Sequence, residues 1–385
     1  MLRTCRHLAA FALAALLAAP AAAQFTGVTT PAAGGSQHAS ASQDIGLVRV
    51  TIDYSSPHVH SPSGVDRRGK IWGKGNLVEY GLTNLGGPST CGDQCPWRGG
   101  ANQNTVFTAT HDVTVQGQRL PAGSYGLHFI PEASEWTVIF SKNSAAWGSF
   151  TYDPEEDALR VMAKPQKSEY HEDLTYEFRE RKPDGATAVL RWEDLELPFA
   201  IKVDNVNDLY VARMREELRS TGGFDWRGWT TAAQFCLANQ THLDEALVWA
   251  QRGLQPKFSG EENFTTLSTL AEALMANGKD SEGKATLAKA LQLPTAGVID
   301  IHLLGRQLIA MKRPDDAVRV FETNVKLHSN VWPVHFGLAR GYAAQGQREK
   351  AIAQAKLALP QAPDAINQAV VRDFIQSLEA GKSGN

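Results

Sequence analysis

A small residue returns at a nearly fixed interval in the C-terminal part of the chain, and this regularity constrains the fold more than any other feature. The small positions are spaced by 37, 34 and 34 residues and are Ala246, Gly283, Ala317 and Ala351. Each lies in an amphipathic stretch such as Pro314-Asp-Asp-Ala-Val. Because helices that cross closely need small side chains at the crossing, the spacing predicts stacked helix pairs, one pair for each period.

Large apolar positions repeat together with the small ones. The stretch with Leu267, Leu270 and Leu274 is followed 34 residues later by Ile301, Leu304 and Leu308. This pattern resembles the tetratricopeptide repeat. The resemblance implies an all-α solenoid over residues 224–385 that docks a peptide or protein partner.

Two arginines of the repeats are candidates for contacting that partner. Arg306 and Arg340 lie 34 residues apart, next to His302 and Phe336. In the tetratricopeptide arrangement these four positions face the concave groove, where arginines can hold a peptide carboxylate. The alternative is an ordinary solvated face.

Short alternating stretches fill the chain before residue 204. Val48, Val50 and Ile52 alternate with polar residues, and Pro183-Asp-Gly185 separates two further alternating runs, as in a β-hairpin. Leu195–Val203 reads as a separate final strand. The pattern predicts an N-terminal antiparallel β-sandwich or flattened barrel over residues 42–203, joined by a connecting helix at 204–223 to the repeats. The fold class is therefore multidomain, β followed by α.

The N-terminus has the features of an export signal. Two arginines precede an apolar run from Leu8 to Ala19, and Ala21–Ala23 form a small-residue cleavage site. We expect a signal peptide at 1–23, a flexible leader at 24–41, and an exported, periplasmic or extracellular protein. No other apolar stretch approaches the about 20 residues of a membrane span. The net charge of −3 gives no support for nucleic-acid binding.

The cysteine pair allows several interpretations. Cys91 and Cys95 lie in Cys-Gly-Asp-Gln-Cys. In an oxidising compartment they would form a disulfide, but two free thiols or half of a metal site would give the same spacing. Cys236 falls in a helical pattern and is expected to be a buried apolar residue.

The stretch Pro96–Thr105 has the composition of a binding surface. Aromatic side chains can stack on an apolar face of a small polar ligand, while a cation and an amide fix its orientation. The candidate ligand-binding residues are Trp97, Arg98, Asn102 and Thr105, with Trp72, Tyr125, His128, Trp147 and Tyr152. The structural alternative is a buried tryptophan and an arginine paired with Asp157 or Glu156.

His58-Val-His60 is the nearest approach to a metal motif. Alternate residues of an extended segment project to one side, and imidazole suits zinc or copper. His128, His111 or Glu79 would supply a third ligand. The alternative is a surface loop with two ordinary histidines. Beyond this metal option the sequence predicts no cofactor.

Several short motifs of the N-terminal half resemble the bacterial domain-of-unknown-function family 2911. They span Ser36 to Val203 in one order: Gln43-Asp-Ile-Gly, Asp53-Tyr-Ser-Ser-Pro57, Arg68-Gly-Lys-Ile-Trp-Gly73, Trp97-Arg-Gly-Gly-Ala-Asn102, Leu120-Pro-Ala-Gly-Ser-Tyr125, Trp147-Gly-Ser-Phe and Tyr152-Asp-Pro-Glu-Glu-Asp157. The resemblance implies an exported β-rich domain and no particular activity. Leu82–Cys95 looks like an insertion relative to the family.

Two functions follow as hypotheses. The first is an exported ligand-binding or assembly protein, with a β-domain pocket for a small polar ligand and helical repeats for a peptide or protein. The second is a metal-assisted hydrolase or lyase that uses His58, His60 and His128. The sequence leaves open whether the protein is an enzyme.

Overall fold

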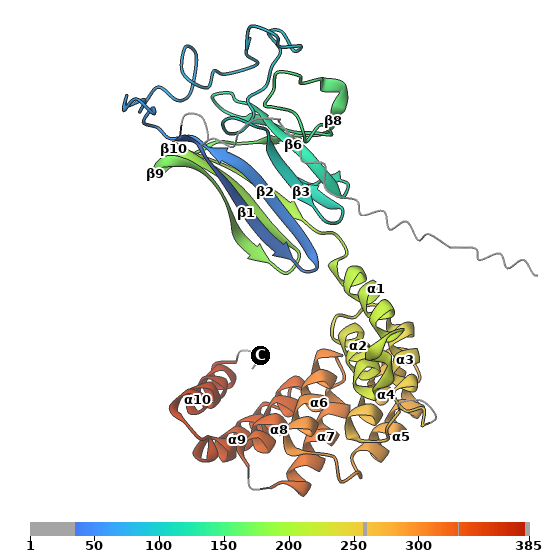
Figure 1. Cartoon of the computed structure of the whole chain (residues 1–385). Helices are drawn as coiled ribbons and strands as arrows, with labels where there is room; N and C mark the ends of the chain where they lie inside the picture. The colour runs from blue at the N-terminus through green and yellow to red at the C-terminus, as the bar shows by residue number, and fades with distance from the viewer. Residues whose placement is uncertain (1–34, 257–259, 330, 382–385) are drawn as a thin grey trace, which may run out of the picture. The chain divides into compact units, whose positions relative to one another are not determined.

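The computed structural model describes residues 35–256, 260–329 and 331–381, and the chain divides into two compact units between Val206 and Asn207 (Figure 1). The predicted signal peptide at 1–23 and most of the predicted leader at 24–41 lie outside these residues. Across the described part of the chain, no helix has the length and apolarity that a membrane crossing requires.

The first unit contains two antiparallel sheets, neither of them closed. The larger sheet has the order β1 Gln37–Ile45, β2 Val48–Ser56, β3 Thr105–Ala109, β6 Gly123–Ile130, β7 Trp136–Ser141 and β8 Asp157–Ala163. The smaller sheet has the order β5 Gln118–Leu120, β4 Val113–Val115, β10 Gly185–Lys202 and β9 Gln166–Lys182. The predicted antiparallel β-domain is thus confirmed.

The alternating pattern of the sequence decides which side chains enter the core. Val48, Val50 and Ile52 of β2 are fully buried, because successive side chains of a strand point to opposite faces. Tyr54 of β2 contacts Tyr176 of β9, with ring centroids 4.9 Å apart. Aromatic packing therefore joins the two sheets.

The first strand begins earlier than the sequence predicts. β1 begins at Gln37, inside the predicted leader, because its Ser- and Ala-rich backbone pairs with the full length of β2, from Gln37 opposite Ser56 to Ile45 opposite Val48. A Ser- and Ala-rich composition is typical of a linker. This segment is a strand because it pairs with β2.

The predicted hairpin at Pro183-Asp-Gly185 is confirmed, since Gly185 pairs with Lys182. The separate strand at Leu195–Val203 is wrong, because β10 continues unbroken to Lys202. Register shifts flank Glu193, whose φ is +57°, and its carboxylate accepts a hydrogen bond from the backbone N–H of Gly69. A bulge, not a turn, interrupts the alternation here.

The second unit consists of helices arranged in sequential pairs. Their bounds are α1 Val206–Leu218, α2 Trp226–Ala238, α3 Leu243–Arg252, α4 Phe264–Ala276, α5 Asp280–Ala290, α6 Val298–Ala310, α7 Pro314–Leu327, α8 Trp332–Ala344, α9 Arg348–Ala358 and α10 Ala365–Glu379. The starts of α4, α6 and α8 are 34 residues apart, which matches the predicted period. The recurring small residues are all buried: Ala246, Gly283, Ala317 and Ala351.

Phe321 of α7 packs into a cluster of glycines on its neighbours. Its side chain is fully buried. A Cβ atom at Gly305 of α6 would lie 2.3 Å from the Phe321 ring, and one at Gly337 of α8 would lie 2.7 Å from it. Both distances are far below van der Waals contact, so these glycines are required by the close approach of the ring. We call Phe321, Gly305, Gly337 and the adjacent Gly341 of α8 the glycine cluster.

Candidate functional site

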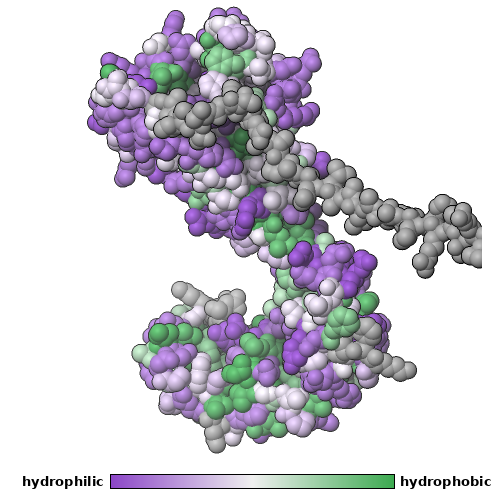
Figure 2. Space-filling view, viewed as in Figure 1, coloured by the Kyte–Doolittle hydropathy of each residue, from purple (hydrophilic) through white to green (hydrophobic). Residues whose placement is uncertain are grey.

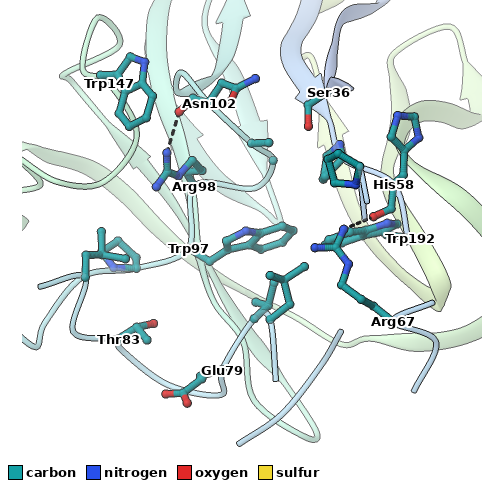
Figure 3. Close-up of a pocket in the computed structure, with 18 of the residues that line it drawn as sticks. Ser36, His58, Arg67, Glu79, Thr83, Trp97, Arg98, Asn102, Trp147 and Trp192 are labelled. Atoms are coloured by element: carbon teal, nitrogen blue, oxygen red, sulfur yellow. Dashed lines mark hydrogen bonds between the residues drawn. The ribbon is translucent and has the colours of Figure 1, made fainter. Parts of the chain in front are cut away.

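A pocket of about 480 Å³ opens in the first unit, beside the loops that connect β2 to β3. Four of the nine predicted ligand-binding residues line it, namely Trp97, Arg98, Asn102 and Trp147. Figure 3 shows Trp97 across the middle of the pocket, with Arg98 and Trp147 to one side and Arg67 and His58 to the other. Its volume is in the range typical of small-molecule sites.

Backbone hydrogen bonds hold Trp97 and the segment after it in place. The Trp97 N–H donates to the Phe129 carbonyl at 2.8 Å, and the Phe129 N–H donates back at 2.7 Å. The segment is thus fixed to the end of β6. Asn102 adopts a φ of +57°, and its carbonyl accepts a hydrogen bond from Arg98 Nη1 at 2.7 Å.

Tryptophan side chains form the apolar base of the pocket. Trp97 stacks on Trp192 of β10, with centroids 6.3 Å apart and planes inclined by 13°. Trp72 packs edge-on against both rings, at 5.5 Å from each. The indole N–H groups of Trp72 and Trp192 are buried and have no hydrogen-bond partner among the described residues. The base therefore offers flat apolar surface to the pocket, while these two donors stay buried beneath it.

Arg98 lies half-buried at the pocket without a carboxylate partner in the described ranges. Its guanidinium carbon is 5.3 Å from the Trp147 ring centroid and 5.4 Å from that of Phe150. Burial lowers the pKa of Arg98. A Cβ at Gly148, whose φ is +67°, would lie 2.4 Å from Arg98 Nη1, so the absence of a side chain there makes room for the cation.

The predicted alternative in which Arg98 pairs with Asp157 is wrong. That carboxylate accepts hydrogen bonds from Arg160 Nε at 2.6 Å and from the Tyr152 hydroxyl at 2.8 Å. Asp157 is therefore paired with Arg160 and Tyr152. The charge of Arg98 is left facing the pocket.

A second arginine, Arg67, lines the other side of the pocket. Arg67 donates from Nε to the Val59 carbonyl at 3.0 Å and from Nη2 to the His58 carbonyl at 2.6 Å. These are neutral acceptors, and no ion pair of Arg67 is present within the described chain. Backbone carbonyls orient Arg67 without neutralising it.

His58 and His60 each contact a carboxylate of β9. His58 Nδ1 bonds to Asp173, and His60 Nδ1 lies 2.9 Å from Glu172 Oε2. His128 is 2% exposed in β6, and its Nδ1 bonds to the Ser149 hydroxyl at 3.0 Å. Burial, followed by the charge of Arg98, lowers the pKa of His128 to about 4.

The structure does not assemble the predicted histidine metal site. His58 and His60 line the pocket, but His128 does not. Within the residues that the structure describes, no group of three or more His, Cys, Asp or Glu side chains has an arrangement that could hold a metal ion. The reason is that the β9 carboxylates engage both loop histidines, while the pleat of β6 turns His128 into the core.

The remaining predicted ligand-binding residues lie outside the pocket lining. Thr105 is fully buried in β3, the Tyr125 hydroxyl donates to the Pro121 carbonyl at 3.0 Å, and Tyr152 donates to Asp157. Trp72 supports the base from below. Sequence reasoning missed Arg67 and Trp192 as pocket residues. The alternating pattern around Trp192 is visible in the sequence, but the contact of Trp192 with Trp97 is not.

Cys91 and Cys95 form a disulfide, with Cα atoms 5.2 Å apart. The Thr90 N–H donates to the Phe150 carbonyl at 2.7 Å. The disulfide loop is thereby tied to the segment that carries Trp147 over Arg98. Cys236 is buried, as predicted.

The four predicted partner-binding residues of the repeats have different environments. Arg306 is exposed and Arg340 is half-buried. His302 Nδ1 lies 3.0 Å from the Pro333 carbonyl, and burial lowers its pKa. Phe336 is only 4% exposed and packs on Phe374 of α10 with centroids 5.3 Å apart. The prediction that Phe336 faces a partner is therefore wrong, because α10 covers it.

The fold and the pocket define an open antiparallel β-domain followed by helical-pair repeats. Residues 36–201 match the family described as "Protein of unknown function (DUF2911)". This match confirms the resemblance that the N-terminal motifs indicate. A comparison with curated proteins found no match.

Solved structures similar to the chain include helical-repeat proteins. YrrB, described as a TPR protein with an unusual peptide-binding site, is 18% identical over 44% of this chain and 85% of its own, with a TM-score of 0.28. TTC0263, a TPR protein of Thermus thermophilus, is 19% identical over 45% and 90%, with a TM-score of 0.31. Pseudomonas aeruginosa pilF is 16% identical over 46% and 84%, with a TM-score of 0.29.

The charge of His58 should follow its contact with Asp173. The hydrogen bond that His58 donates to Asp173 raises the pKa of His58, burial opposes this, and the Gly35 carbonyl adds to it. The His58–Asp173 pair therefore contributes stability at pH values below about 6.5 and loses it as pH rises through the higher folded pKa. NMR titration should give a His58 midpoint above about 6.5. Asp173→Asn should lower that midpoint; an unchanged midpoint would show that the contact does not set the charge.

Proposed function

We propose that this protein is an exported binding protein whose β-domain takes a small anionic ligand with a flat apolar part, and whose helical repeats dock a peptide or protein. The observation that carries the proposal is Arg98, a half-buried cation that faces the pocket with no carboxylate partner among the described residues. A desolvated charge without a partner is costly, and a bound anion would compensate it.

The rest of the pocket supports the same ligand class. Arg67, whose hydrogen bonds go to backbone carbonyls, adds positive charge on the side opposite Arg98, while His58 is paired with Asp173. The half-buried indole of Trp97, held in place by its stacking on the buried Trp192, suits a planar apolar group. A carboxylate, phosphate or sulfate would thus be held by the arginines while its ring or chain lies on the tryptophans.

Two arginines of the repeats support an acidic docking group on the partner. Burial, and then the like charge of Arg306, lowers the pKa of Arg340. Neither arginine has an ion pair within the described ranges; Arg340 lies over the Phe336 ring at 4.7 Å. A carboxylate of a peptide would relieve the repulsion between them. The disulfide of Cys91 and Cys95 in turn supports export to an oxidising compartment.

The β-domain proposal is tested by substituting Arg98. A panel of aromatic carboxylates and aryl phosphates is screened by calorimetry against the full chain and against Arg98→Met. Hydrogen bonds to charged groups contribute about 1.5–3 kcal/mol, so the substitution should weaken binding roughly ten- to a hundredfold. Arg119→Met is the matched control, because Arg119 is exposed and paired with Asp112. Equal affinities for the chain and both variants would refute the proposal.

A further inference from the structure

A second pocket, of about 490 Å³, lies in the repeat unit between α2, α4 and α6. Its walls include Phe264 and Leu304, both nearly fully buried, and Leu303, which is 53% exposed. Figure 2 shows hydrophobic (green) surface over the α6 and α8 region, with hydrophilic (purple) residues beside it. The recess therefore combines apolar walls with polar and charged side chains.

Glu272 of α4 lines this recess and is 8% exposed. Its carboxyl group has no hydrogen bond or ion pair within the described parts of the chain. Neighbouring polar side chains are engaged elsewhere: Ser268 donates to the Thr265 carbonyl at 3.1 Å, and Gln234 donates to Thr269 Oγ1 at 3.0 Å. The Glu272 carboxyl opens onto the recess, so a ligand carrying the complementary group could pair with it there.

The other charged residues that line the recess leave Glu272 uncompensated. α2 contributes only Gln234 and Ala238, while α6 contributes Asp300 and Arg306. Burial raises the pKa of Glu272 to about 8, and Arg306 makes no ion pair with Glu272 within the described residues. Asp300 adds a second acid to the lining. A cationic group of a ligand would thus complement the two acids, Glu272 and Asp300.

We propose that this recess binds the side chain of a lysine from a peptide partner, with its ammonium group at Glu272 and its four-carbon stem against Phe264, Leu303 and Leu304. A lysine stem packs on apolar surface while its charged end reaches a polar partner. The identity of the occupant as part of a peptide rests on the proposed function of the repeats. Arg306, which also lines the recess, would meet an acidic group next to that lysine.

Binding of the lysine couples to loss of a proton from Glu272. At about pH 7 the free carboxyl is mainly protonated, and the lysine ammonium, with a pKa of about 10.4, is charged. When the ammonium enters, Glu272 releases its proton to solvent and the ion pair forms. Affinity should therefore rise about tenfold from pH 6 to pH 7 and level off above the pKa of Glu272.

The test uses Nα-acetyl-lysine amide as the probe and the full chain as the receptor. Calorimetry in two buffers of different ionisation enthalpy should show release of nearly one proton at about pH 7. Nα-acetyl-norleucine amide, which has a similar stem and no charge, should bind at least about tenfold more weakly. Glu272→Gln should remove both the pH dependence and the proton release. The exposed Glu282→Gln on α5 is the matched control and should leave both unchanged.

Folding does not confound the test, because glutamine resembles the neutral form that Glu272 takes in the free protein; the melting temperature of the variant checks this. Equal binding of the two probes, no binding of either, or unchanged binding to Glu272→Gln would overturn the inference. A lysine-free peptide with a free C-terminal carboxylate tests the proposed function separately. If Arg340→Ala weakens that peptide while the lysine probe fails, only the lysine site is wrong.

Discussion

Replacing Phe321 by alanine should lower the free energy of unfolding of the repeat unit by about 3–5 kcal/mol, the usual cost of removing a buried phenylalanine ring. We expect the upper part of this range. The ring is fully buried, and Gly305 and Gly337 have no side chains that could move into the space it leaves. A cavity that its neighbours cannot fill carries the largest penalty.

The measurement is hydrogen exchange in increasing urea, resolved over peptides from residues 298–344. Leu327→Ala is the control, since Leu327 lies on the same helix and is 53% exposed; surface substitutions change stability by about 0.5 kcal/mol or less. A loss below about 1 kcal/mol for Phe321→Ala would contradict the packing described for the glycine cluster.

Replacing Trp192 by alanine should have a comparable effect on the β-domain, about 3–5 kcal/mol, and should also abolish ligand binding. Trp192 is 1% exposed and contacts both Trp72 and Trp97. Without it, Trp97 loses the ring on which it stacks and the base of the pocket collapses.

Chemical denaturation followed by near-ultraviolet circular dichroism measures the stability change, and the calorimetric panel used for Arg98 measures binding. Trp147→Ala separates the two effects. Trp147 lines the pocket but is 50% exposed, so its removal should weaken binding while stability changes little. If Trp192→Ala retains the stability of the parent protein, the tryptophan base is not the support that we describe.

The helical half of the fold was predictable because its signal repeats. Small residues such as Ala317 and Ala351 show where the helices cross, because each recurs once in every helix pair. The environment of Phe336 was not predictable in this way. Its cover is α10, which begins 33 residues after α8 and so nearly keeps the period. None of the four recurring small residues lies in α10, so the sequence could not distinguish a groove position of Phe336 from burial.

The pocket was only half predictable, for a related reason. Trp97, Arg98 and Asn102 are close in sequence, and their residue types indicate binding by themselves. Arg67 and Trp192 join them through long-range packing of a loop and a bulged strand, which no local pattern encodes. Glu272 is the extreme case: within an amphipathic helix a glutamate reads as solvated, and only the neighbouring helices α2 and α6 make it a buried acid.

The glycine cluster also limits how this repeat array can be rearranged. Phe321 is contributed by one helix pair but occupies space left by Gly337 of the next. Deleting, duplicating or exchanging a single helix pair at this junction would leave either a cavity beside Gly337 or a Phe321 ring that clashes with its new neighbour. Engineered or evolved changes in repeat number should therefore be tolerated at other junctions before this one, and the two pairs should be inherited as a single module.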